Sequence, residues 1–209
     1  MKKLQIAFDD NKLEECIEIG NMVYDYIDII EFGTPMVYKY GAEGVKELKK
    51  HFPNKKVLAD FKIMDGGALE TQIALKAGSD IVTVLALADN ITIEDSLKEV
   101  KKENKELLVD LIGVEDLEAR VNYLDNLGVD YICVHTGVDV QKTGESPLDT
   151  LKKVNQMVKN TKISVAGGIN INTAEDISKA GADVVIVGSG LVKAENPLYT
   201  AKQIRELIK

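Results

Sequence analysis

The stretch 179-KAGADVVIV-187 places a glycine, an aspartate and a β-branched apolar run in close succession, and the same order occurs twice more. The other two copies are 76-KAGSDIVTV-84 and 126-NLGVDYICV-134. Glycine often ends a helix in a left-handed conformation, aspartate favours the turn that follows, and a continuous apolar run is typical of a strand covered on both faces. Three copies of one helix-to-strand junction predict repeated β-α units.

Strand-like apolar runs extend this pattern along the whole chain. They are Leu4–Phe8, Ile27–Phe32, Val57–Phe61, Ile81–Leu85, Leu107–Ile112, Tyr131–Val134, Ile163–Ala166 and Val184–Val187. The segments between them have helical spacing, and Ser146-Pro147 and Asn196-Pro197 each place a cap residue before a proline suited to a first helical turn. We therefore expect an α/β protein, a single (β/α)8 TIM barrel domain over residues 1–209. The alternative, an open doubly wound sheet, is disfavoured because no Gly-x-Gly-x-x-Gly follows the first strand.

The composition argues against several classes of protein. The net charge is -8, and the chain has no Trp and four Phe, whereas a nucleic-acid-binding surface needs a basic stripe and stacking aromatics. No segment approaches the roughly 18 to 20 apolar residues of a membrane helix, and the apolar start before Asp9 is too short for a signal sequence. Cys16 and Cys133 lack the spacing of metal ligands, and we interpret them as reduced thiols of a cytoplasmic protein.

In a TIM barrel the carboxyl ends of the strands form the active face. Charged residues or a histidine end five of the predicted strands: Asp9 the first, Glu31 the second, Asp60 and Lys62 the third, Asp110 the fifth and His135 the sixth. The last two strands run instead into Gly167-Gly168 and Gly188-Ser189-Gly190. The predicted active face thus combines acids, one lysine and one histidine with two glycine loops.

The segment 57-VLADFKIMDGG-67 places charges inside an apolar run. Asp60 and Lys62 are two residues apart on a predicted strand, so both side chains are expected on the same side, where each keeps the other charged. Asp65 lies beyond the strand, in the loop, and is expected to point elsewhere. The alternative is a buried ion pair followed by a helix-capping aspartate, but buried ion pairs are poor stabilisers.

Glu31 and Asp60 end neighbouring strands, and carboxylate oxygens are ligands that Mg²⁺ prefers. On the residues alone, the pair fits a magnesium site and two solvated carboxylates at the barrel rim equally well. His135 ends an apolar strand and begins a polar loop, where a histidine can act as a general base near neutral pH. The alternative for His135 is a rim residue that caps a turn.

The two glycine loops follow strands seven and eight, the usual place for a phosphate in this fold. Glycine allows backbone N–H groups to approach phosphate oxygens, and a following helix N-terminus favours negative charge. Glycines also occur in such turns for steric reasons alone. Two loops in the expected places predict a phosphate site at Gly168, Gly188, Ser189 and Gly190.

Several of these segments resemble a known enzyme family. The segment 58-LADFKIMD-65 carries the Asp-x-Lys-x-x-Asp motif of the orotidine-monophosphate decarboxylase suprafamily. Within that suprafamily, 29-IIEFGTP-35, 129-VDYICVHTGVDVQ-141, 165-VAGGI-169 and 185-VIVGSG-190 resemble the 3-hexulose-6-phosphate synthase family. The resemblance covers essentially the whole chain.

The resemblance implies a Mg²⁺-dependent aldehyde-lyase of the ribulose monophosphate pathway that condenses formaldehyde with ribulose 5-phosphate. It implies that Glu31 and Asp60 bind the metal, Lys62 stabilises an enediolate, His135 shuttles the proton at C1, and Asp9 binds substrate hydroxyls. It assigns the phosphate to the four residues of the glycine loops named above. It also implies a homodimer with shared active sites, in which Asp65 serves the partner's site.

Three alternatives remain at this stage. The sibling 3-keto-L-gulonate-6-phosphate decarboxylases carry Arg directly after the equivalent of His135, again two residues later, and in the last phosphate loop. This chain has Thr136, Val138 and Ser189 there, where synthases often have Tyr at the second position and Gly at the third. A non-catalytic phosphosugar-binding barrel and a phosphosugar epimerase are the other two alternatives, and the Asp-x-Lys-x-x-Asp motif argues against the epimerase.

Overall fold

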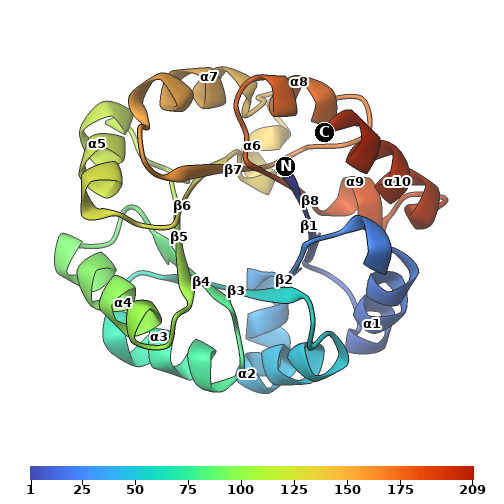
Figure 1. Ribbon diagram of the computed structural model, residues 1–209, viewed down its shortest axis with the longest axis horizontal. Coiled ribbons are helices and arrows are strands. Elements are labelled where there is room, and N and C mark those ends of the chain that lie inside the picture. Colours follow the sequence, from blue (N-terminus) through green and yellow to red (C-terminus); the bar gives the residue numbers. More distant parts are fainter.

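The computed structural model describes residues 1–209 and contains eight parallel strands that close into a barrel, with β1 paired to both β2 and β8 (Figure 1). The strands are β1 (Lys3–Phe8), β2 (Ile29–Phe32), β3 (Lys56–Ile63), β4 (Ile81–Leu85), β5 (Glu106–Asp110), β6 (Tyr131–His135), β7 (Lys162–Ala166) and β8 (Val184–Val187). The predicted (β/α)8 barrel is confirmed.

Helices follow the strands and form a ring outside the sheet (Figure 1). They are α1 (Leu13–Met22), the 3-10 helix η1 (Tyr24–Tyr26), α2 (Thr34–His51), α3 (Gly67–Lys76), α4 (Asn90–Lys102), α5 (Leu117–Leu127), α6 (Val138–Gln141), α7 (Leu148–Met157), α8 (Ala174–Lys179), α9 (Ser189–Val192) and α10 (Pro197–Leu207). None of these helices combines the length and the apolarity needed to span a bilayer.

Buried apolar side chains form two separate clusters. A cluster of 45 residues fills the space between the sheet and the helices. A second cluster, inside the barrel, contains Ala7, Ile29, Leu58, Ile81, Leu108, Tyr131, Cys133, Val184 and Ile186. Four of these, Ile29, Ile81, Tyr131 and Val184, are the first residues of the even-numbered strands. Because alternate strands of a TIM barrel contribute each interior layer, these side chains close the barrel below the active face.

The repeated Gly-x-Asp junction has a role in the barrel that its turn chemistry does not reveal. An aspartate before each even-numbered strand accepts a hydrogen bond from a backbone N–H group near the start of the preceding strand. The pairs are Asp28 with Leu4 (2.8 Å), Asp80 with Val57 (2.9 Å), Asp130 with Leu107 (2.9 Å) and Asp183 with Ile163 (2.8 Å). The carboxylates therefore tie the strands together in successive pairs, and the barrel repeats with a period of two β-α units.

Several predicted strand boundaries differ from the structure by one or two residues, and two of the differences have clear local reasons. β2 begins at Ile29 rather than Ile27, because the 3-10 helix η1 extends to Tyr26 and the next two residues connect it to the strand. β5 ends at Asp110 rather than Ile112, because the Asp110 carboxylate accepts a hydrogen bond from the Ile112 backbone N–H group at 2.9 Å and turns the chain out of the sheet.

Candidate active site

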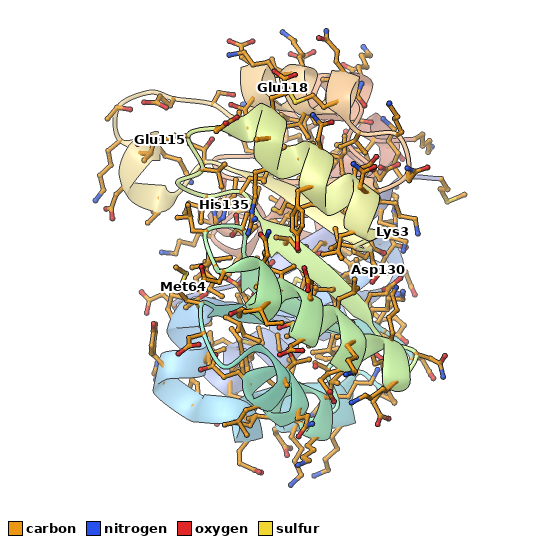
Figure 2. The ribbon with its side chains drawn as sticks, turned by 90° about the vertical axis from the view of Figure 1, so that its left-hand side faces the viewer. Lys3, Met64, Glu115, Glu118, Asp130 and His135 are labelled. Atoms are coloured by element: carbon orange, nitrogen blue, oxygen red, sulfur yellow. The ribbon has the colours of Figure 1, made fainter.

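The side chains predicted to carry chemistry lie at one end of the barrel. Figure 2 shows His135 and Met64 at that end, and Lys3 and Asp130, which lie at strand starts, at the other. The strands run parallel, so their carboxyl ends all open on the His135 side. This is the end at which TIM barrels place their active sites.

Lys62 is held between two buried carboxylates. Its ammonium nitrogen lies 2.7 Å from Asp60 Oδ2 and 3.2 Å from Asp110 Oδ2. Burial acts to lower the pKa of Lys62, but the charges of Asp60 and Asp110 outweigh it and raise that pKa. Lys62 is therefore a fixed ammonium over the whole neutral range, at the centre of the predicted site.

The Asp60–Lys62 contact was predicted, but regular strand alternation does not produce it. Lys62 has a φ of 47°, in the left-handed region, which costs a residue with a side chain about 1–2 kcal/mol. The register between β3 and β4 shifts between Ala59 and Ile63. A β-bulge, of the kind that re-aims side chains next to active sites, thus places the ammonium beside Asp60.

Two threonine hydroxyls fix the Asp60 carboxylate. Thr34 Oγ1 donates to Asp60 Oδ2 at 2.7 Å, and Thr83 Oγ1 donates to Asp60 Oδ1 at 2.8 Å. With Lys62, three donors hold a side chain that is only 8% exposed. Neither threonine was predicted as a site residue, because neither carries a chemical signal in the sequence beyond its position at a strand or helix.

His135 is oriented by Asp110, whose carboxylate lies 2.8 Å from Nδ1 of the ring. Burial acts to raise the pKa of Asp110, but the hydrogen bond and charge of His135, with Lys62 nearby, lower it below the usual value. The ionised carboxylate accepts the Nδ1 proton, which leaves Nε2 for a substrate. Asp110 was recognised at a strand end but given no role, since only the fold brings β5 beside β6.

Glu31 and Asp9 complete an acidic cluster. Burial, followed by repulsion from the Asp60 and Asp9 carboxylates, raises the pKa of Glu31 well above its usual value. Burial and repulsion from Asp60 also raise the pKa of Asp9. Gln5 Nε2 donates to Glu31 Oε2 at 2.6 Å, whereas Gln5 Oε1 is buried without a partner. The cluster contains more negative charge than its own lysine balances.

This donor set fits a divalent cation that completes its coordination with other oxygens. No three His, Cys, Asp or Glu side chains converge as a ready-made metal site. Mg²⁺, however, usually takes only one or two carboxylates and keeps water or substrate oxygens in its other positions. Glu31 and Asp60 supply two carboxylates on paired strands, and the raised pKa of Glu31 reflects negative charge that a cation would relieve.

The two glycine loops lie against each other. A Cβ atom added to Gly190 would be 2.5 Å from the Ile169 carbonyl oxygen, so the loop after β8 packs directly on the loop after β7. A Cβ atom added to Gly167 would be 2.3 Å from the Thr136 carbonyl oxygen, so the loop after β7 also packs on the loop after β6. Gly168 has a positive φ of 68°. α9 begins directly at Ser189, so its first N–H groups have no partner within the helix. α8 begins only at Ala174, so the predicted helix N-terminus beside the loop exists after β8 but not after β7.

Asp9 borders both the acidic cluster and the last glycine loop. A Cβ atom added to Gly188 would be 3.5 Å from Asp9 Oδ2, and one added to Gly33 would be 2.2 Å from Asp9 Oδ1. Asp65, in contrast, lies in the exposed loop after β3, where its carboxylate accepts a hydrogen bond from the backbone of Gly66. The structure therefore brings the predicted site residues together except Asp65, which lies outside this group in the exposed loop.

Comparison with known proteins places this geometry in a family. The family model described as Orotidine 5'-phosphate decarboxylase / HUMPS family matches residues 2–204. A 3-hexulose-6-phosphate synthase of Staphylococcus aureus is 46% identical over 207 residues, which cover 99% of either chain.

Solved structures give the same picture. The crystal structure of 3-hexulose-6-phosphate synthase from Salmonella typhimurium matches with a TM-score of 0.96 and 42% identity, over 99% of this chain and 98% of the other. The structure of 3-keto-L-gulonate-6-phosphate decarboxylase from Vibrio cholerae matches with a TM-score of 0.87 and 28% identity, over 100% and 98% of the two chains. The resemblance inferred from the motifs is confirmed.

Proposed function

The chain belongs to the orotidine 5'-phosphate decarboxylase / HUMPS family, and from that premise we propose that it acts as a 3-hexulose-6-phosphate synthase. This enzyme condenses formaldehyde with ribulose 5-phosphate to form D-arabino-hex-3-ulose 6-phosphate, and it also catalyses the reverse reaction. The observation that carries the proposal is the convergence of Asp60, Lys62 and the Asp110–His135 pair at one barrel mouth. Synthases related over their full length, at 46% and 42% identity, support it.

The reaction follows from the roles that the geometry permits. His135 Nε2 removes a proton from C1 of ribulose 5-phosphate, and the electron pair moves onto the C2 oxygen to give an enediolate. The Lys62 ammonium stabilises that negative charge. C1 then attacks the formaldehyde carbon to form the new carbon–carbon bond, and the resulting alkoxide takes a proton from His135. Asp9 accepts hydrogen bonds from substrate hydroxyls, and the glycine loops hold the phosphate.

Glu31 and Asp60 are the side chains that would hold Mg²⁺ in this site. When bound, the metal supplies Lewis-acid stabilisation of the negative charge on substrate oxygens. The neighbouring hydroxyl groups keep the Asp60 carboxylate in one orientation, and Gln5 does the same for Glu31.

The decarboxylase alternative rests on a more distant likeness, at 28% identity. Its pattern calls for arginines beside the histidine and in the last phosphate loop. Both arginines of this chain are engaged elsewhere: Arg120 donates to the Ala86 and Ala88 carbonyl oxygens, and Arg205 to those of Tyr26 and Lys2. No arginine is thus available to act as a proton donor or anion contact at the mouth.

The test is an assay of purified protein with Mg²⁺. We expect consumption of formaldehyde that depends on ribulose 5-phosphate, is lost with EDTA and returns with Mg²⁺. Lys62→Ala should abolish turnover, whereas Lys98→Ala, an exposed lysine on α4, should not change it. Release of CO₂ from 3-keto-L-gulonate 6-phosphate without formaldehyde consumption would instead identify the decarboxylase. A wild type that binds ribulose 5-phosphate but turns nothing over would identify a binding module.

The proposal includes a cytoplasmic homodimer with shared active sites. The support for the dimer is a set of exposed apolar side chains on α3, on α4 and in the loops that precede them: Met64, Leu69, Ile73, Leu87 and Ile91. We call this set the α3/α4 surface. Met64 is adjacent to Asp65. If a second copy of the chain docks on this surface, Asp65 of each chain lies close to the active site of the other. The support for the cytoplasm is that both cysteines are free and buried.

A further inference from the structure

The bulge in β3 leaves one residue of β4 facing three residues of its neighbour. Ala59 pairs with Val82 and Ile63 pairs with Val84, so Asp60, Phe61 and Lys62 lie opposite Thr83 alone. A bulge interrupts the ladder of backbone hydrogen bonds, and its unpaired N–H groups need other partners. The Lys62 N–H group is in this position, and it belongs to the residue with the positive φ.

The side chain of Thr83 replaces the missing ladder bond. Thr83 Oγ1 accepts a hydrogen bond from the Lys62 backbone N–H group at 2.9 Å. The same hydroxyl donates its own proton to Asp60 Oδ1 at 2.8 Å. Thr83 is 2% exposed, so no water competes for either bond. One buried hydroxyl thus connects the left-handed backbone of the lysine to the carboxylate beside its ammonium.

We propose that Thr83 is a positioning residue of the reaction, which holds the Lys62 backbone in its left-handed conformation and fixes the Asp60 carboxylate next to the Lys62 ammonium. This inference rests on the proposed function for its effect on turnover, but not for the hydrogen bonds themselves. Thr34 provides a useful contrast, because its hydroxyl donates to Asp60 and makes no hydrogen bond to the Lys62 backbone. Substitution of Thr34 therefore tests the orientation of the Asp60 carboxylate alone, whereas substitution of Thr83 tests this orientation together with the Lys62 backbone conformation.

The experiment compares Thr83→Val, which keeps the shape and removes the hydroxyl, with Thr83→Ser, which keeps the hydroxyl. In Thr83→Val we expect kcat to fall about 10- to 100-fold, as for other residues that orient ligands and catalytic groups. Inhibition by inorganic phosphate should be unchanged, because Thr83 lies on β4 and its hydrogen bonds go to Lys62 and Asp60, whereas the glycine loops follow β7 and β8. Thr83→Ser should restore most of the kcat.

A second measurement does not depend on activity. Hydrogen exchange of the Lys62 backbone amide should be slow in the wild type, in Thr83→Ser and in Thr34→Val, and at least about 10-fold faster in Thr83→Val, since that amide has lost its buried acceptor. Thr71→Val is the matched control, because Thr71 is a fully buried threonine whose hydroxyl has no partner within the protein. It should change neither the kcat nor the Lys62 exchange rate.

The outcomes distinguish the inference from the function on which it rests. Wild-type protein without turnover would contradict the proposed function. The exchange rates of the Lys62 amide would still show whether it is hydrogen-bonded to Thr83. Unchanged exchange of the Lys62 amide in Thr83→Val, or equal loss of kcat in Thr83→Ser and Thr83→Val, would overturn the positioning role. If Thr83→Val does not fold, Thr83→Ala serves the same comparison with the same expected results.

Discussion

At the scale of single residues, Glu31 is where stability and function oppose each other. The residue is only 9% exposed, and both burial and repulsion from the Asp60 and Asp9 carboxylates raise the pKa of its carboxyl group. A group whose pKa is raised on folding destabilises the folded state when it is ionised, so Glu31 costs stability at neutral pH unless a cation is bound.

We therefore predict that Glu31→Gln is more stable than the wild type at pH 7 without Mg²⁺, by about 0.5–2 kcal/mol. Addition of Mg²⁺ should raise the thermal unfolding midpoint of the wild type but not that of Glu31→Gln, which should also be inactive. Urea and thermal unfolding, each with and without EDTA, measure both effects. A less stable variant, or one with a wild-type response to Mg²⁺, would show that Glu31 does not carry this charge conflict.

The residues that end the strands and the contact between Asp60 and Lys62 were predictable, whereas the other contacts of these residues were not. Asp60, Lys62 and His135 stand out because charge and imidazole interrupt apolar runs, and a TIM barrel brings all strand ends to one face. The interaction of Asp110 with His135 depends on the register between β5 and β6, which no local pattern specifies. The left-handed backbone conformation at Lys62 could not be predicted either, because nothing in the sequence signals a positive φ at a lysine.

At the scale of elements, the aspartates before even-numbered strands are the devices that join neighbouring strands. Asp80 accepts hydrogen bonds from Val57 N at 2.9 Å, Lys49 Nζ at 2.7 Å and Lys105 Nζ at 2.6 Å. Burial acts to raise the pKa of Asp80, but these hydrogen bonds lower it below its usual value. The stabilisation is therefore present above the unfolded-state pKa and is lost as the pH falls through the folded-state pKa.

We predict that Asp80→Asn lowers the free energy of unfolding by about 1–3 kcal/mol at pH 7. The difference from the wild type should shrink as the pH falls below the unfolded-state value near 3.8. Asp149→Asn is the matched control, because the Asp149 side chain is 89% exposed and pairs only with Lys152 on the same helix. Urea unfolding across this pH range measures both variants. A pH-independent effect at Asp80, or one no larger than at Asp149, would contradict the prediction.

Helices and strands could be predicted from the sequence wherever local residues determine where they begin. Asn196 before Pro197 predicted a helix start, and α10 begins at Pro197 with the Asn196 side chain accepting from Tyr199 N. At Ser146-Pro147 the helix α7 begins one residue later, at Leu148. Contacts between elements could not be predicted in this way. The hydrogen bond from Val57 to Asp80, for example, joins positions that only the closed sheet brings together.

At the scale of the whole molecule, the α3/α4 surface is the feature that a monomer does not explain. Its largest exposed fractions are 66% at Leu69 and 62% at Ile91, on helices that pack side by side. Exposed apolar side chains that lie together mark an interaction site, and this is the basis of the dimer proposed above. It also adjoins the loop of Asp65, the one predicted site residue that the structure leaves outside the cluster.

From the proposed dimer with shared active sites, we predict that the double substitution Leu69→Lys and Ile91→Lys shifts the protein from dimer to monomer in sedimentation experiments. It should also abolish activity, because in that dimer each site takes Asp65 from the partner subunit. Tyr199→Lys, at a 57% exposed aromatic on α10 across the barrel in Figure 1, should change neither property.

Lys62→Ala and Asp65→Ala should each be inactive alone. Mixed and reassociated, they should recover about a quarter of wild-type activity, since about half of the dimers are mixed and each contains one intact site of two. No recovery in verified mixed dimers would show that each chain completes its own site, and full activity of a monomer would remove the shared-site proposal altogether.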